Sequence, residues 1–260
     1  MAPLRKDGFL RRFLWIAFLL SVFFGGAAPL RAFDPTAAPH IVLISGEPEY
    51  FSSNSLPAFA KLLETNFHFR CTFVQRTDSN NIPGLEALAT ADLAILFVRR
   101  MTLPEEQLGR IKKHLDSGKP LIGLRTASHA FENWKSWDHD VLGGNYHMHH
   151  GNQLRATAHA VPSARTHPIL RNVAAEFDTA GSLYKTSPLS ENTTLLLMGN
   201  IDGQPPEPMA WTHDYHGARI FYTSLGHPRD FDNRSFENLL VNAVFWCLRQ
   251  EAPGPNVQPK

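Results

Sequence analysis

The chain has 260 residues, of which 43% are hydrophobic and 19% are charged, and this suits a folded domain with a sizeable core. Its 25 lysines and arginines nearly balance 24 acidic residues, which argues against a nucleic-acid-binding surface and against an acidic disordered chain. Cys71 and Cys247 form no CxxC motif, so a disulfide scaffold and a zinc ribbon are disfavoured, and two buried thiols are the expected state.

The N-terminus has the composition of a secretory signal peptide. Basic residues at positions 5–12 precede an apolar run over 13–24, and small residues follow at 25–28. We therefore expect residues 1–28 to be cleaved off, with export to the periplasm or cell envelope and no stable membrane contact afterwards. An uncleaved membrane anchor is the alternative. The remaining chain would carry 21 basic and 23 acidic residues, so the mature protein would be mildly acidic.

The first half of the remaining chain alternates strands with helices. Residues 29–38 are predicted to be a linker, 39–250 the folded domain and 251–260 a disordered tail. The predicted strands are His40–Ser45, Phe69–Gln75, Leu93–Val98 and Pro120–Leu124. The predicted helices are one capped by Asn54 or Ser55, a short one over Leu85–Ala91, and one from Pro104 to Gly118. Such alternation with short connections indicates a parallel sheet with helices on both faces.

The second half is richer in strands. The predicted elements are strands Gln153–Val161 and Thr193–Gly199, a hairpin of Met209–Asp214 with Arg219–Leu225, and a last helix capped by Ser235. The whole pattern predicts an α/β fold: a doubly wound, mostly parallel sheet with helices on both faces and a C-terminal β-hairpin.

Informative polar segments follow the predicted strands. Ligands of open parallel sheets bind at the carboxyl ends of the strands. Here these ends carry Ser45–Tyr50, Arg99–Arg100, Gly123–His129 and Gly226–Phe231. We expect these four segments to converge on one crevice.

The segment Gly123–His129 has the pattern of a nucleophile elbow, in which an apolar strand and a glycine lead through a sharp turn into a helix. Its apex would be Arg125, which cannot be a nucleophile, although its guanidinium can bind a carboxylate or a sugar oxygen. A structural ion pair of Arg125 with Glu47 or Glu49 is the alternative. Ser128 and His129 do not form a catalytic dyad merely by being adjacent.

Two acidic residues lie close together after the first strand. Glu47 and Glu49 could act as a general base, as metal ligands or as acceptors for sugar hydroxyls. Acidic residues are equally expected at the N-terminus of a helix, so both interpretations stay open.

Histidines are concentrated in the middle of the chain. Seven of the 13 fall between His129 and His167, and the densest group is His147, His149 and His150. These three could hold one divalent metal ion, although their spacing matches no established zinc signature. The alternative is that one of them lines a pocket and the others face water.

His227 is the histidine that we favour most as a functional residue. It follows an apolar strand and precedes Pro228, which restricts its backbone and fixes its presentation. An ordinary exposed loop histidine is the alternative. His213, on the predicted hairpin, could also reach the pocket.

The order and spacing of these motifs resemble the ThuA-like family, named for trehalose utilisation, over about residues 38–249. The matching segments are Ile44–Glu47, Gly123–His129, Leu142–Tyr146, Thr166–Pro168, Ser182–Tyr184, Ala210–Trp211, Arg219–His227 and Asn242–Trp246. The resemblance implies a flavodoxin-like fold related to class I glutamine amidotransferases. That larger group has a catalytic cysteine at the elbow and a His-Pro-Glu sequence, whereas this chain has Arg125 at the elbow and Arg229 after Pro228. Amidotransferase chemistry is therefore excluded. Many ThuA-like proteins carry histidine at the elbow, and Arg125 departs from that pattern too.

The resemblance implies a role in carbohydrate metabolism, with a small sugar or glycoside as the partner. Our first hypothesis is an enzyme, a lyase or hydrolase, that acts on an oxidised (3-keto) sugar or glycoside by acid–base chemistry. His227 would be the acid or base and Glu47 its partner, and Arg125 or a metal ion would stabilise the enediolate. The expected substrate-binding residues are Glu49, Tyr50, His129, Tyr184, Trp211, His213 and Asp230. The alternative is a non-catalytic carbohydrate-binding or sensing module.

Overall fold

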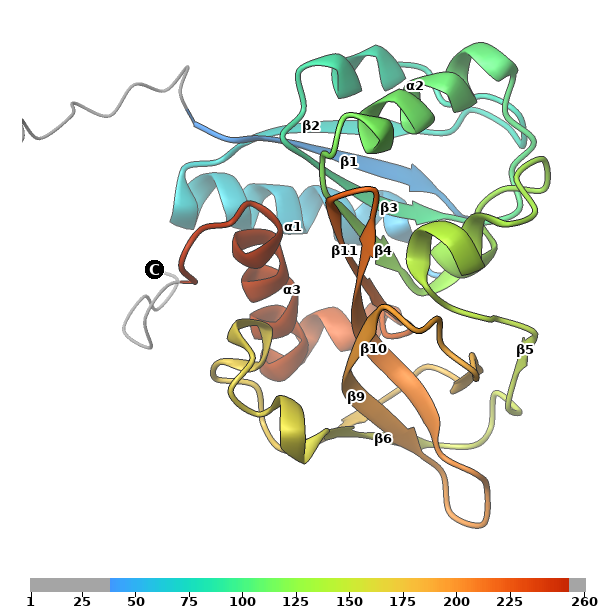
Figure 1. Ribbon diagram of the computed structural model, residues 1–260, viewed down its shortest axis with the longest axis vertical. Helices are drawn as coiled ribbons and strands as arrows, with labels where there is room; N and C mark the ends of the chain where they lie inside the picture. Colours follow the sequence, from blue (N-terminus) through green and yellow to red (C-terminus); the bar gives the residue numbers. More distant parts are fainter. Residues whose placement is uncertain (1–37, 253–260) are drawn as a thin grey trace, which may run out of the picture. The chain divides into compact units, whose positions relative to one another are not determined.

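The computed structural model describes residues 38–252 of the chain. These residues form a nine-stranded sheet with helices packed against it (Figure 1). Its strands are β1 (His40–Gly46), β2 (Arg70–Gln75), β3 (Leu93–Val98), β4 (Leu121–Leu124), β6 (Ala156–Ala160), β7 (Glu176–Thr179), β9 (Thr193–Asn200), β10 (Glu207–Tyr215) and β11 (Ala218–Thr223). A separate two-stranded ribbon pairs β5 (Met148–His149) with β8 (Tyr184–Lys185). The predicted signal peptide over 1–28 lies outside the described residues, as do most of the predicted linker and tail.

The helices are few. The three α-helices are α1 (Ser52–Phe67), α2 (Glu105–Asp116) and α3 (Arg234–Cys247) among the described residues. Short helical turns are η2 (Leu85–Ala89), η3 (Arg125–His129), η4 (Trp137–Leu142), η5 (Pro162–Ala164), η6 (Pro168–Leu170) and η7 (Pro228–Asp232). No helix in the described part of the chain combines the length and the apolar character needed to cross a membrane.

The sheet has a parallel half and an antiparallel half. Its order is β2-β1-β3-β4-β11-β10-β9-β6-β7. The first five strands of this order run parallel to one another, and each later strand is antiparallel to its neighbour. The α/β class is therefore as predicted, while the sheet is mixed, because β6, β7, β9 and β10 add antiparallel strands.

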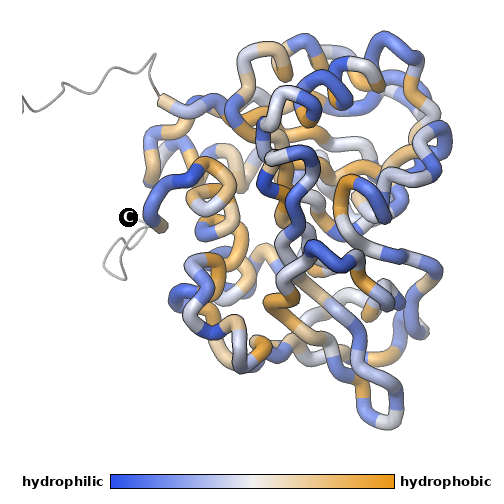
Figure 2. The backbone as a smooth tube through the Cα atoms, in the orientation of Figure 1, coloured by the Kyte–Doolittle hydropathy of each residue, from blue (hydrophilic) through white to orange (hydrophobic). Residues whose placement is uncertain are grey.

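Two apolar cores cover the two faces of the sheet, and strand β1 shows how. Ile41 and Leu43 face α1 and α3, whereas Val42 and Ile44 face α2, and all four are buried. This explains why the sequence of β1 is apolar throughout rather than alternating. Figure 1 shows α1 and α2 on opposite sides of the β1–β3 region, and in Figure 2 the exposed loop joining β9 to β10 has hydrophilic colours.

Element boundaries differ from the sequence prediction where loop geometry decides them. Helix α1 starts earlier than expected, because Phe51 turns the chain in the left-handed region with φ 54°. Helix α3 is capped by Asn233, whose side chain accepts from the Ser235 backbone N–H, rather than by Ser235 itself. Cys71 and Cys247 are unpaired thiols as expected, although Cys71 is only half-buried.

Candidate functional site

Four parallel strands bring their following loops to one edge of the sheet. Strands β1, β3, β4 and β11 are consecutive neighbours in the sheet and point the same way. The loops that follow them carry Glu47 to Tyr50, Arg99 and Arg100, Arg125, and Ser224 to His227. The four segments therefore lie together at one edge of the sheet, and we call this group of loops the strand-end site; a crevice between them stays a prediction.

The turn after β4 has the sharp geometry of an elbow. Arg125 lies at its apex with φ 44°, in the left-handed region that non-glycine residues rarely adopt. The Tyr222 hydroxyl donates to the Arg125 carbonyl oxygen over 2.7 Å and holds this turn. A side chain at Gly123 would crowd the Tyr222 ring, which explains the glycine at the end of β4.

The Arg125 guanidinium is buried without a carboxylate partner. Nη1 donates to the Ser224 carbonyl (2.8 Å), and Nη2 donates to the hydroxyls of Ser182 (3.1 Å) and Tyr50 (3.2 Å). The guanidinium carbon lies 4.2 Å from the centre of the Tyr50 ring and 4.8 Å from that of Tyr184. Nε has no hydrogen-bond partner among the described residues. Such burial of an uncompensated charge is costly and points to a functional role.

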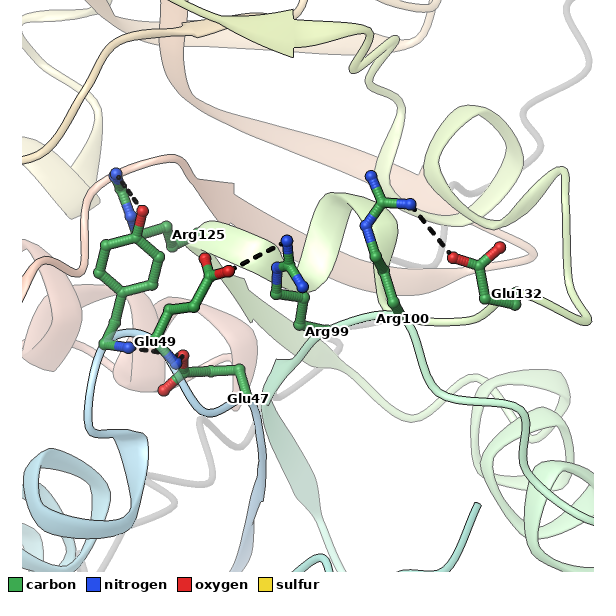
Figure 3. A network of polar contacts seen from close by, with 7 residues as sticks. Glu47, Glu49, Arg99, Arg100, Arg125 and Glu132 are labelled. Atoms are coloured by element: carbon green, nitrogen blue, oxygen red, sulfur yellow. Dashed lines mark hydrogen bonds and ion pairs between the residues drawn. The ribbon is translucent and has the colours of Figure 1, made fainter. Parts of the chain in front are cut away.

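The alternative of an ion pair between Arg125 and Glu47 or Glu49 is wrong. Glu49 instead pairs with Arg99 at 3.0 Å, as Figure 3 shows. Burial lowers the pKa of Arg125, but Tyr184, Tyr50 and the Asp230 carboxylate together raise it by more, so the pKa lies above its ordinary value. The group is therefore a permanent cation, and its hydrogen-bond partners are all neutral.

Glu47 is used to build the loop that carries Tyr50. One of its carboxylate oxygens accepts the backbone N–H groups of Glu49 and Tyr50, each over 2.7 Å, and the other accepts that of Ser52 over 2.8 Å. The side chain is buried. With both oxygens engaged by backbone donors, Glu47 is placed as a positioning residue rather than as the expected partner of His227.

Asp230 fixes the loop after β11 in the same way. One oxygen accepts from the Thr179 hydroxyl and the Ala180 N–H, and the other accepts from the N–H groups of Gly226 and His227. Asp230 is buried and has a structural role in this loop, while its expected contact with a substrate stays a prediction. It ties the loop before η7 to the end of β7.

His227 reaches the strand-end site. Its Nδ1 accepts the Arg229 backbone N–H over 3.2 Å, which leaves the proton of the neutral imidazole on Nε2. Its ring lies edge-on to Tyr50, with ring centres 6.2 Å apart. Burial and then the Arg125 charge lower the pKa of His227, against the opposing effect of Asp230. At neutral pH this histidine is therefore an uncharged donor through Nε2–H.

His129 lies beside Tyr146 and Tyr184. It stacks on Tyr146 with ring centres 4.4 Å apart, and Tyr146 lies 4.7 Å from Tyr184. The His129 Nδ1 also lies 3.0 Å from the Ser128 hydroxyl, a pairing that adjacency in the sequence did not establish. Burial, together with Arg100, Arg99 and Arg125, lowers the pKa of His129 to about 3, so this ring stays neutral.

Trp211 and His213 do not line the strand-end site. Trp211 is fully buried, donates through Nε1 to the Leu142 carbonyl and packs on Tyr222. His213 points from β10 to η4, where its Nε2 lies 3.3 Å from the Asp140 carbonyl oxygen. Both side chains contact η4 here, and their expected contact with a substrate stays a prediction. Strand alternation alone could not tell which face of β10 they occupy.

The three histidines of the expected metal site do not converge. His147 Nε2 contacts the Ser187 carbonyl oxygen at 2.9 Å, and His149 Nδ1 contacts the His150 carbonyl oxygen at 2.7 Å. His150 Nε2 is buried without a partner. Residues 38–252 contain no group of three His, Cys, Asp or Glu side chains that could hold a metal ion. The donor set therefore does not fit a metal centre.

Asp138 is an ionisable group that sequence reasoning missed. Its Oδ2 accepts the Tyr146 N–H over 2.6 Å, while its Oδ1 is buried without a partner. Burial raises the pKa of Asp138 to about 7, against the opposing effects of the Tyr146 N–H and of His139 and His147. It lies in η4, a single π-helical turn, which is a feature common at functional sites.

Comparison with known proteins agrees with this architecture. The ThuA family model, described as trehalose utilisation, matches residues 41–247. A ThuA-like protein from Parabacteroides merdae superposes with a TM-score of 0.66 at 17% identity, covering 84% of this chain and 92% of that one. One from Bacteroides uniformis gives 0.64 at 18%, covering 85% and 95%. A β-galactosidase from Rahnella sp. gives 0.55 at 12%, covering 86% of this chain and 33% of that one. These identities show likeness of fold alone. No curated protein matches significantly.

Replacement of Gly181 by alanine should displace the Arg125 guanidinium. A Cβ at Gly181 would lie 2.6 Å from Nη1 of Arg125, whose buried guanidinium is held by three hydrogen bonds. We expect Gly181→Ala to destabilise the domain by about 1–3 kcal/mol in urea unfolding. Gly109→Ala, on α2 with nothing near the new methyl group, should be neutral or stabilising. If Gly181→Ala lowers the free energy of unfolding by the same amount in the wild type and in Arg125→Ala, a clash with Arg125 is not the cause.

Asp138→Asn should stabilise the protein at alkaline pH. Because the folded-state pKa is raised from 3.8 to about 7, the folded protein binds a proton that the unfolded chain releases as pH rises between these values. Stability is therefore lost across that range, by up to ~4 kcal/mol. The melting temperature of Asp138→Asn should exceed that of wild type at pH 8 and match it at pH 4. Asp140→Asn, at an exposed carboxylate whose pKa is lowered by Ser136 and His139, should show no such gain. A less stable Asp138→Asn at pH 8 would contradict the expectation.

Proposed function

Because the chain belongs to the ThuA family of trehalose utilisation, we propose that it is an enzyme acting on an oxidised sugar, a 3-keto glycoside. The observation that carries this proposal is the Arg125 guanidinium, which is buried beside Tyr50 and Tyr184 without a carboxylate. Preorganised donors of this kind stabilise negative charge that develops in a transition state. A keto sugar that loses a proton next to its carbonyl develops such a charge on the carbonyl oxygen.

The Tyr50 hydroxyl is the proposed contact to that oxygen. It accepts a hydrogen bond from Arg125 Nη2, so its own O–H remains to donate outward from a half-buried ring. The buried cation polarises this O–H, and Arg125 thus acts through Tyr50. Three of the five guanidinium N–H donors already have protein acceptors, which fixes the orientation of the cation.

Glu49 and His227 are the groups that we assign to the proton transfer and to the leaving group. Glu49 is the carboxylate on this loop whose oxygens are not taken by backbone donors, and Arg99 orients it at 3.0 Å. We assign Glu49 as the base that removes the proton next to the keto group. The electron pair of that C–H bond forms the enediolate and then expels the glycosidic oxygen from the adjoining carbon. The leaving oxygen takes up the proton that Glu49 has removed, and the neutral His227 donates a hydrogen bond to this oxygen through Nε2–H.

Further parts of the proposal come from the sequence and the topology. The order β2-β1-β3-β4-β11 supports the flavodoxin-like interpretation, and the antiparallel pair β10–β11 supports the C-terminal hairpin. The basic and apolar composition of residues 1–28 supports export to the periplasm or cell envelope.

A non-catalytic carbohydrate-binding module is the second candidate. It is favoured by the engagement of Glu47 and Asp230 with backbone donors, which leaves few free carboxylates for acid–base work. In that case the wild-type protein would bind sugars but would release no product from any keto glycoside.

Turnover of a 3-keto glycoside should depend on Tyr50 and Arg125 as one unit. We expect Tyr50→Phe and Arg125→Met each to lower kcat by about 10²–10³-fold, with the double variant no worse than the poorer single one. The matched control is Arg219→Met, which removes a half-buried arginine stacked on Trp246 at 4.7 Å, and it should leave kcat unchanged. The assay is release of the leaving group from the keto glycoside. Wild-type kcat in both Tyr50→Phe and Arg125→Met would refute the assignment.

A further inference from the structure

A cavity of about 420 Å³ lies between η2 and α2, and we call it the α2 cavity. Its volume falls within the range of roughly 300–1,000 Å³ that ligand pockets occupy. Its lining includes η2, which precedes β3, and Lys119, which precedes β4. The cavity therefore lies toward the amino ends of these strands, whereas the strand-end site lies at their carboxyl ends.

Two lysines at the α2 cavity have no acidic partner. Lys113 and Lys119 both line the cavity, and neither forms an ion pair within the described part of the chain. The arginine of the lining, Arg110, is paired with Glu86 at 3.7 Å and with Glu106 at 2.7 Å. The carboxylate that lines the cavity is thus already bound to a guanidinium, and two ammonium groups are left without a counter-charge. This distribution of charge favours an anionic ligand.

Most of the remaining lining is apolar. Leu85 and Leu88 lie beneath Ala89, and the Ala89 side chain is the exposed one of the three. The long stems of the two lysines can add methylene groups to this surface while their ammonium groups stay in water. A ligand with an apolar body next to its charged group would therefore cover more of the cavity than an inorganic ion would.

His114 leaves an unused nitrogen in the wall of the α2 cavity. Its residue is 3% exposed, and its Nε2 lies 3.0 Å from the Pro120 carbonyl oxygen, so Nε2 carries the proton. The Leu88 carbonyl could pair with Nδ1 only if the ring were charged, and burial, together with Lys119, lowers the pKa of His114. In the neutral ring Nδ1 has no partner among the described residues. Buried nitrogens of this kind are rare unless a water or a ligand satisfies them.

Stabilisation of α2 does not account for both lysines. Lys113 lies in the last turn of α2, where a cation complements the helix dipole. Lys119 lies beyond the end of that helix, in the connection to β4. Two unpaired cations from different segments therefore meet at one cavity, which the helix dipole alone would not require.

We propose that the α2 cavity binds a small phosphate monoester, with the phosphate beside Lys113 and Lys119 and the apolar body against the surface around Ala89. Two unpaired ammonium groups match the two negative charges of such a phosphate, and lysine binds phosphate well as a point charge. This site is separate from the strand-end site, so its occupation does not depend on the proposed function.

The test is calorimetric titration of the full chain with phenyl phosphate. We expect phenyl phosphate to bind more tightly than inorganic phosphate, which lacks the apolar body, and phenol, which lacks the charge, not to bind measurably. Lys113→Gln and Lys119→Gln should each weaken the binding of phenyl phosphate by about tenfold. The matched control is Lys112→Gln, which removes the same charge from α2 at a residue that pairs with Glu105 instead, and it should bind as wild type does.

A second variant fills the cavity without changing its charge. Ala89→Phe places a ring where the exposed Ala89 side chain now lines the cavity, and it should abolish the binding of phenyl phosphate. Because Ala89 is exposed, the melting temperature of this variant without ligand should stay within about 2 °C of that of the wild type. Turnover of a keto glycoside should be unchanged in Ala89→Phe, since the strand-end site is not altered.

Four results would overturn the proposal. Equal weakening by Lys112→Gln would show attraction to the net charge of the protein alone. Reduced stability of Lys113→Gln with unchanged affinity would show that this lysine serves only the helix. Equal affinity for phenyl phosphate and inorganic phosphate would exclude recognition of an apolar body. Absence of phenyl phosphate binding to the wild type at millimolar concentration would exclude the site.

Discussion

The burial of the Arg125 cation constrains the whole carboxyl edge of the sheet. Removing a guanidinium from water costs several kcal/mol unless partners replace the lost hydration. The partners here are a carbonyl oxygen of Ser224, two hydroxyls and two aromatic faces, contributed by the loop after β1, the β7–β8 segment and the end of β11. Each loop must therefore be in place for the others to be stable. Gly181 belongs to the same arrangement, since only a residue without a side chain leaves room for the guanidinium.

The carboxylates around this cation are directed to the backbone rather than to the cation itself. Glu47 binds the turn that presents Tyr50, and Asp230 binds the turn that presents His227. The negative charges of these two carboxylates therefore hold the loops in place, and the centre of the site is left positive. A site built in this way does little to stabilise a neutral ground state, but it favours a species that gains negative charge as it reacts.

The sequence predicted those features that depend on local patterns. Continuous apolar runs such as His40–Ser45 predicted buried parallel strands, and the glycine before Arg125 predicted the elbow. The roles of Glu47 and Trp211 could not be predicted. The role of Glu47 depends on three backbone N–H groups that converge only in the folded turn. The role of Trp211 depends on which face of β10 is buried. No pattern in the sequence indicated the role of Asp138, because segments distant in the sequence bury it. One of them carries Trp211, whose ring lies beside Gly144 together with the Asp138 carboxylate.

The charges next to the strand-end site are distributed unevenly. His129 lies among three arginines, and their fields together with burial keep its ring neutral. Glu132 contacts both Arg100 and Lys135, so one carboxylate is shared by two cations. The hydrogen bonds of the Arg125 guanidinium all go to neutral oxygens. Positive charge is therefore concentrated at the carboxyl ends of the strands, and a ligand that becomes anionic as it reacts would be stabilised best there.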